Sequence, residues 1–124
     1  MADMTTSPVS PFMCDMYAIE PANRDRHIAT TLEVFQAAQA VRELPNGYAF
    51  RLPNETTLLM KATEFIANER LCCPFLSFTV EIEPEGGPLW LHLTGRDGVK
   101  PFIQAEIGEA LNEAIAKVVG FRSQ

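Results

Sequence analysis

Three cysteines are the residues of this sequence most able to do chemistry, and they are Cys14 and the adjacent pair Cys72 and Cys73. Glu69 stands three and four residues before the pair, so on a helix its carboxylate can reach either thiol. If Cys14 lies beside this helix end, three sulfurs meet in one place, and such a site favours soft, thiophilic ions. We therefore predict that Cys14, Cys72 and Cys73 bind a soft metal or metalloid ion of the mercury, arsenite or copper(I) class.

The expected place of the cysteine pair favours metal ligands over a free nucleophile. We predict a helix over residues 55–73 that ends before Pro74, because proline cannot continue the hydrogen-bond ladder. The C-terminal end of a helix dipole disfavours a free thiolate, whereas a bound metal ion can deprotonate a thiol by itself. A closed zinc site would need a fourth ligand. His27 is a better candidate for it than His92, which we expect on the outer face of its strand.

Glu69 interrupts the apolar face of this predicted helix. The other residues of that face are Leu58, Ala62, Phe65 and Ile66. A carboxylate on a core face is costly unless it is paired, so a basic residue of the preceding helix is the simplest partner. The candidates for that partner are Arg24, His27 and Arg42. Without a partner, burial could leave Glu69 protonated near neutral pH, which makes it a candidate catalytic acid. Asp15 is a weaker candidate, because it would point to the opposite strand face from Cys14.

The cysteine count and the first residues of the chain predict the compartment. An odd number of cysteines does not suit a secreted disulfide framework, and a disulfide between the adjacent Cys72 and Cys73 would be strained. We therefore expect three reduced thiols in a reducing compartment. Residues 1–10 have no basic or apolar region typical of a signal peptide, and no apolar run approaches the roughly 20 residues that span a bilayer. These features predict a cytoplasmic protein.

The composition excludes some classes of partner. The chain has 124 residues, of which 47% are hydrophobic and 21% are charged, the balance of a globular domain. Its net charge is −6, with 16 acidic against 10 basic residues. Because the sequence has no dense basic patch, nucleic acid is not expected as a partner. A membrane is not expected either, since no apolar run is long enough to span one. A homodimer is left open, and a thiophilic ion or a small organometal compound is the expected ligand.

Residues 1–11 are rich in Thr, Ser and Pro and are predicted to form a flexible lead. Apolar periodicity and turn residues predict a single α+β domain over residues 12–124. Its helices should pack on a small, mostly antiparallel sheet. The expected β-α-β-α-β-β-α order has strands over residues 12–19, 48–52, 75–83 and 89–93 and helices over residues 21–44, 55–73 and 99–118. Cys14 should point inward from the first strand, and Ile28, Leu32 and Phe35 should form the buried stripe of the first helix.

The segment Glu69-Arg70-Leu71-Cys72-Cys73-Pro74-Phe75-Leu76-Ser77-Phe78 is the most distinctive part of the chain. It resembles an E-R-x-C-C-P-F-x-x-F motif of small, largely uncharacterised bacterial proteins that often accompany MerR-type heavy-metal regulators. The similarity extends over residues 83–98 and to the early Cys14, and so covers most of the chain after residue 11. The resemblance implies handling of metals or metalloids; it implies no particular activity.

Three functions are compatible with these residues. The first is a thiol protein that binds a soft metal or metalloid ion for resistance or buffering. The second is an enzyme that cleaves an organometal bond, with two thiols holding the metal and Glu69, or less well Asp15, donating the proton. The third is a structural or dimerisation domain whose cysteines lie in the core.

Overall fold

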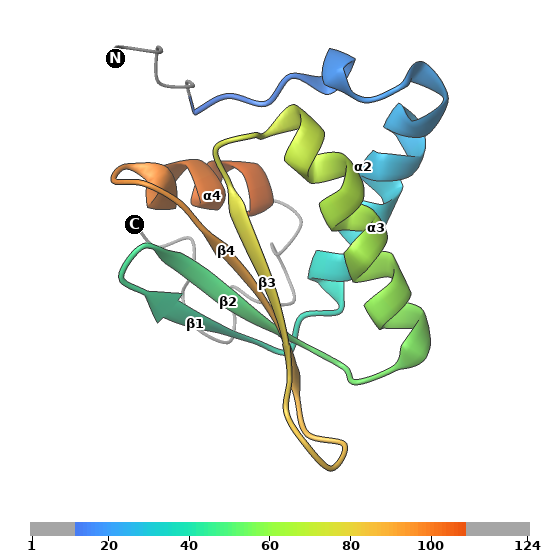
Figure 1. The fold of residues 1–124 in the computed structure, drawn as a ribbon, viewed down its shortest axis with the longest axis vertical. Coiled ribbons are helices and arrows are strands. Elements are labelled where there is room, and N and C mark those ends of the chain that lie inside the picture. The colour runs from blue at the N-terminus through green and yellow to red at the C-terminus, as the bar shows by residue number, and fades with distance from the viewer. Residues whose placement is uncertain (1–11, 109–124) are drawn as a thin grey trace, which may run out of the picture.

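A four-stranded antiparallel sheet and three α-helices make up residues 12–108, the part of the chain that the computed structural model describes (Figure 1). The helices are α2 (Pro21–Gln36), α3 (Thr56–Cys72) and α4 (Val99–Ile107), and a short 3₁₀ helix, η1 (Met16–Ala18), precedes them. The strands are β1 (Ala40–Leu44), β2 (Gly47–Leu52), β3 (Ser77–Ile82) and β4 (Leu89–Thr94), arranged in the order β1-β2-β4-β3. The predicted α+β class, with helices packed on an antiparallel sheet, is confirmed. None of the helices in residues 12–108 is long and apolar enough to cross a membrane.

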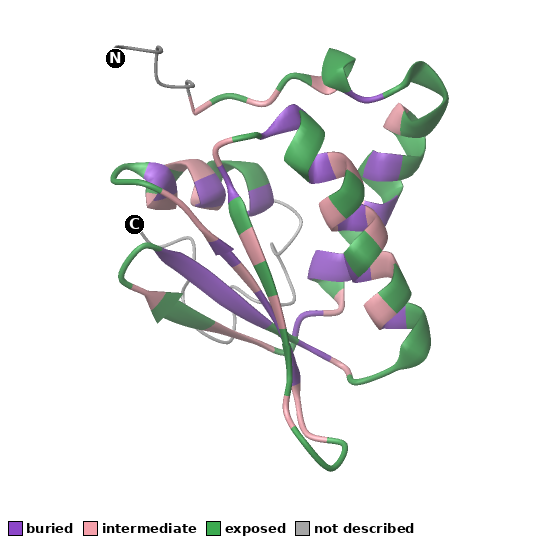
Figure 2. Ribbon diagram, in the orientation of Figure 1, coloured by how far each residue is buried: buried purple, intermediate pink, exposed green. Residues whose placement is uncertain are grey.

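The core lies between one face of the sheet and the three helices. Figure 2 shows that β2 is buried along most of its length. Phe35 of α2 packs edge-on against Phe50 of β2 and Phe65 of α3, while α4 reaches the same sheet face through Gln104, which donates a hydrogen bond to the Tyr48 hydroxyl. Helices α2 and α3 also pack against each other, so side chains on their facing surfaces are in contact at one end of the core.

The opposite face of the sheet carries Trp90, which lies between the inward-facing Leu89 and Leu91 of β4. The guanidinium of Arg42 stacks over its indole ring at 4.0 Å, and the indole N–H donates to the Glu83 carboxylate. This face is therefore separated from α2, α3 and α4 by the full thickness of the sheet.

Two tight turns determine how the strands pair. The Pro45-Asn46 turn joins β1 to β2, and Gly47 follows it where a Cβ atom would lie 2.0 Å from the carbonyl oxygen of Leu93. Only glycine fits against the neighbouring strand there. The hairpin from β3 to β4 turns at Glu85 and Gly86, both with positive φ.

Two predicted elements in the first third of the chain, the strand over residues 12–19 and the helix over residues 21–44, differ from the structure. Residues 12–19 form an extended segment ending in η1 rather than a strand, because the Asp15 carboxylate caps η1 and the Arg24 guanidinium binds the carbonyls of Met16 and Ile19. The predicted helix over residues 21–44 ends at Gln36, and residues 40–44 form β1 because they pair with β2. The order within the described residues is therefore α-β-β-α-β-β-α.

The buried stripe of α2 also differs from the prediction. Phe35 is buried as expected, but Ile28 and Leu32 are 51% and 41% exposed. The face that packs on α3 carries His27 and Thr30 instead, so α2 is rotated about its axis relative to the expected orientation. Two other predictions concern residues outside the described range of 12–108. They are the flexible lead over residues 1–11 and the last part of the helix over residues 99–118.

Candidate metal centre

The C-terminal end of α3 brings Glu69, Cys72 and Cys73 together, and the segment before η1 adds Cys14. A backbone hydrogen bond of 2.8 Å from the Asp15 N–H to the Cys72 carbonyl holds this segment against the helix end. The helix ends at Cys72 because Pro74 follows two residues later. The predicted meeting of Cys14, Cys72 and Cys73 around Glu69 is therefore confirmed, although Cys14 arrives from an irregular segment and not from a strand.

A disulfide joins Cys14 to Cys73, which are separated by 59 positions in the sequence. Cys72 keeps a free, buried thiol. The prediction of three reduced thiols is therefore wrong for Cys14 and Cys73. That prediction rested on the odd number of cysteines and on the strain of a Cys72–Cys73 bond. The fold instead places the Cα atom of Cys14 4.8 Å from that of Cys73, within ordinary disulfide reach.

The four groups of the cluster are in close contact. The Cys73 sulfur lies 3.3 Å from one carboxylate oxygen of Glu69, and the Cys72 sulfur lies 3.6 Å from the other. The two neighbouring sulfurs are 3.6 Å apart. One ligand atom from each of Cys14, Glu69, Cys72 and Cys73 lies within 4.8 Å of the others, so these residues could hold a metal ion.

Glu69 is paired with His27 of α2. The His27 Nε2 atom lies 2.7 Å from a Glu69 carboxylate oxygen, and both side chains are almost fully buried. The imidazole also stacks on Phe65, while its Nδ1 atom is buried and has no hydrogen-bond partner among the described residues. Of the three predicted partners of Glu69, His27 is confirmed. Arg24 binds backbone carbonyls instead, and Arg42 lies over Trp90.

The structure places two other sequence candidates outside the cluster. Asp15 is exposed, and its carboxylate accepts a hydrogen bond from the Tyr17 N–H at 3.0 Å, so it serves as the cap of η1. His92 lies on the sheet face opposite the helices, 3.5 Å from the Glu81 carboxylate. Neither belongs to the group of ligand atoms that lie within 4.8 Å of one another.

Sequence reasoning missed Glu106, which α4 brings to the cluster. One of its carboxylate oxygens lies 3.3 Å from the Cys14 sulfur. Partial burial raises the pKa of Glu106, and the nearby Glu69 carboxylate adds to the effect. The sequence carries no signal for this contact, because an acidic residue in a predicted helix is ordinary and only the packing of α4 brings it near Cys14.

A cavity of about 350 Å³ opens directly at this cluster. Cys14, Cys72 and Glu69 line it, together with the apolar side chains of Met16, Ile28 and Leu32. The rotation of α2 that leaves Ile28 and Leu32 exposed therefore places them on the wall of this cavity. A ligand held by the sulfurs would have an apolar surface beside it.

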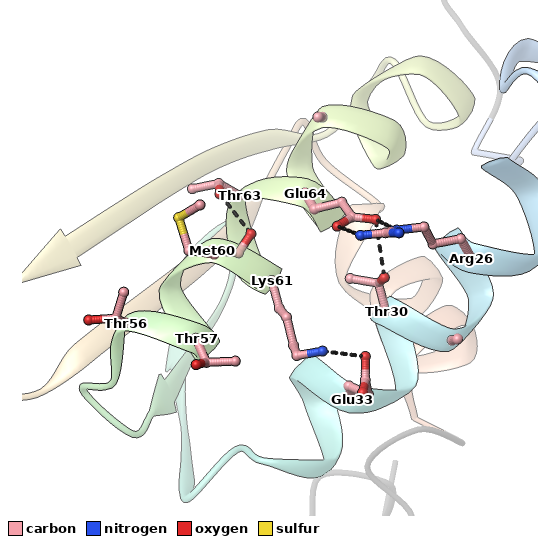
Figure 3. Close-up of a pocket in the computed structure, with 11 residues that line it drawn as sticks. Arg26, Thr30, Glu33, Thr56, Thr57, Met60, Lys61, Thr63 and Glu64 are labelled. Atoms are coloured by element: carbon pink, nitrogen blue, oxygen red, sulfur yellow. Dashed lines mark hydrogen bonds and ion pairs between the residues drawn. The ribbon is translucent and has the colours of Figure 1, made fainter.

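A larger hollow of about 850 Å³ lies between α2 and α3, away from the cysteines (Figure 3). Two ion pairs join the helices across it: Arg26 binds Glu64, and Lys61 binds Glu33 at 3.0 Å. The four charged side chains that line this hollow are therefore paired with one another in ion pairs. We interpret this hollow as a bridged helix interface, and the cysteine cluster as the candidate site.

The Cys72 thiol is expected to be almost unreactive toward iodoacetamide at pH 8. Burial raises its pKa from 9.0 to about 12, and the Glu69 carboxylate adds to the effect. A shift of this size lowers the thiolate fraction at pH 8 about 1,000-fold. The rate of alkylation of the oxidised protein, followed by mass spectrometry, should rise about tenfold per pH unit until the pH nears 12.

The same shift predicts how stability depends on pH. Between pH 9 and 12 the unfolded chain loses the Cys72 proton while the folded chain keeps it, so the stability present below pH 9 is lost as the pH rises.

The alkylation experiment has two control variants. A Glu69→Gln variant should be alkylated faster than the parent at the same pH, and Glu64→Gln on the same helix should not. Fast alkylation of the folded parent at pH 8 would contradict the expected environment of Cys72.

Comparison of the chain with protein-family models, with curated proteins and with solved structures found no match in any of the three. The resemblance of residues 69–78 to the E-R-x-C-C-P-F motif, and the link to heavy-metal regulators that it implies, stay predictions. The functional argument therefore depends on the geometry of the cluster.

Proposed function

We propose that the reduced protein binds one soft metal or metalloid ion of the mercury, arsenite or copper(I) class through Cys14, Cys72 and Cys73. The observation that carries this proposal is the cluster itself, in which three sulfurs and the Glu69 carboxylate lie within 4.8 Å of one another. Sulfurs about 2.3 Å from a shared ion lie about 4 Å apart. The cluster therefore needs little rearrangement beyond the opening of its disulfide.

Opening of the Cys14–Cys73 disulfide is the first step. A dithiol reductant supplies two electrons and two protons, so the S–S bond breaks, two cysteine thiols form and the reductant becomes a disulfide. The protein then presents three thiols. With arsenite, As(OH)₃, each thiol replaces one hydroxide, so that three arsenic–sulfur bonds form and three water molecules leave.

Glu69 and His27 prepare the site for its ligand. The carboxylate contacts both Cys72 and Cys73, and its hydrogen bond to His27 holds it in that orientation. Hydrogen-bond partners that orient the side chains around a metal ion raise the affinity of the site for that ion. A carboxylate oxygen also provides a fourth donor for an ion that takes more than three ligands, as zinc does.

The biological role that fits this chemistry is resistance or buffering in a reducing compartment such as the cytoplasm. A reducing compartment keeps the three thiols available, and the motif of residues 69–78 supports an association with heavy-metal regulation. Cleavage of an organometal bond and a purely structural role stay alternative predictions.

Titration of the reduced protein with arsenite tests the proposal. We expect one arsenite per chain, detected by thiolate–arsenic absorption in the ultraviolet. Each of the variants Cys14→Ser, Cys72→Ser and Cys73→Ser should bind at least about tenfold more weakly, because each removes one of three bonds to arsenic. The oxidised protein, with its disulfide intact and a single free thiol, should bind no arsenite in this manner.

The matched controls separate ligand loss from damage to the fold. Glu64→Gln changes a carboxylate of α3 whose partner is the exposed Arg26, and it should leave arsenite affinity unchanged. Circular dichroism of each cysteine variant reports whether the helices are retained. If folded Cys72→Ser binds arsenite as tightly as the parent, the three-thiol site is wrong.

A further inference from the structure

The cavity beside the cysteine cluster has a surface that a bare ion would not use. It is an open cavity of about 350 Å³, and only Cys14 and Cys72 of the three cysteines line it. An apolar cavity of about 150 Å³ is already large enough to hold benzene. The space next to the sulfurs is therefore sufficient for a small organic group.

The lining of the cavity is suited to an apolar occupant. Ile28 and Leu32, one helical turn apart on α2, are 51% and 41% exposed, and both face the cavity together with Met16. Ligand pockets typically combine such apolar walls with a few convergent polar groups. Here the polar groups are the sulfurs, the Glu69 and Glu106 carboxylates, the His27 imidazole and the Thr31 hydroxyl, all of which line the same cavity.

We propose that the preferred substrate of the thiol site is a soft metal ion that carries one small apolar organic group, such as an aryl- or alkylmercury cation. This inference depends on the proposed function, because the same sulfurs hold the metal. The organic group would lie against Ile28 and Leu32 and remove their side chains from water, which is favourable in proportion to the apolar area buried.

The binding step is a simple exchange at sulfur. The phenylmercury cation carries a water ligand in solution. The Cys72 or Cys14 thiol loses its proton to water, the mercury–oxygen bond to the water ligand breaks, and a mercury–sulfur bond forms in its place opposite the mercury–carbon bond, which stays intact. No oxidation or reduction takes place once the thiols are free. Because both cysteines line the cavity, a group placed opposite either sulfur on mercury remains within reach of the apolar wall.

A comparison of two mercury probes tests this inference. The affinities of the reduced protein for the phenylmercury cation and for Hg²⁺ are measured in competition with a small dithiol. The double variant Ile28→Gln with Leu32→Gln should bind phenylmercury about tenfold more weakly, equivalent to 1.4 kcal/mol, and Hg²⁺ with unchanged affinity. Both residues are exposed, so the variant should retain its fold.

Met60→Gln is the matched control. Met60 is 64% exposed on α3 and lines the other hollow, so its replacement should change neither affinity. If the double variant keeps the parent's ratio of phenylmercury to Hg²⁺ affinity while both probes bind tightly, the organic-group inference is overturned and the thiol site stands. If the parent binds neither probe more tightly than a variant with all three cysteines replaced by serine, both proposals fail.

Discussion

Replacing His27 with alanine is expected to lower the free energy of unfolding by about 3 kcal/mol, because the buried Glu69 carboxylate then loses its imidazole partner. The carboxylate is only 5% exposed, and its neighbours Cys72 and Cys73 cannot stabilise a negative charge as an imidazole does. Urea denaturation followed by circular dichroism measures the loss. The variant also tests whether the stack of His27 on Phe65 is essential for the packing of α2 on α3.

Two further variants identify the cause of that loss. A double variant, His27→Leu with Glu69→Leu, removes both polar groups and should unfold with a free energy within about 1 kcal/mol of the parent. Arg26→Ala breaks the exposed Arg26–Glu64 pair between the same two helices and should have little effect. If the single and double variants at position 27 lose equal stability, the unpaired carboxylate is not the cause.

Reduction of the disulfide is expected to lower the free energy of unfolding by about 4 kcal/mol. The bond between Cys14 and Cys73 closes a loop with a sequence separation of 59, and the loss of this constraint increases the entropy of the unfolded chain. Parallel urea denaturation of the oxidised and reduced protein measures the difference. Addition of arsenite to the reduced protein should recover part of it, since a ligand that binds only the folded state stabilises that state.

The Cys72→Ser variant is the control for this prediction. It keeps the disulfide, so the difference between its oxidised and reduced forms should equal that of the parent. In Cys14→Ser the difference should vanish, because no disulfide can form with Cys73. An equal difference in Cys14→Ser would show that reduction acts on something other than this bond.

The parts of the fold that local sequence determines were predicted well. The helix expected over residues 55–73 is α3, because an apolar face at helical spacing lies between Pro53 and Pro74. The hairpin of β3 and β4 follows from alternating apolar residues on either side of Glu85-Gly86. The position of Glu69 on a core face, and its pairing with a basic residue of the first helix, follow from the same periodicity.

The parts that depend on tertiary pairing were not predicted. Residues 40–44 continue the pattern of the helix before them, and they become β1 only because β2 offers backbone partners. The alternation of residues 12–19 is typical of a strand, yet no neighbouring strand is placed to pair with it in the described residues. The Cys14–Cys73 disulfide and the approach of Glu106 to Cys14 are contacts between distant segments, which spacing along the chain does not encode.

Trp90 lies on the sheet face opposite the described helices α2, α3 and α4, where Arg42 stacks on its ring and Glu83 accepts its N–H. It is the single tryptophan of the chain, and the whole sheet stands between it and the cysteine cluster. The molecule therefore carries two spatially separate reporters. The fluorescence of the indole reports whether the sheet is intact, whereas the ultraviolet absorption of the thiolate–metal bonds reports a bound ion.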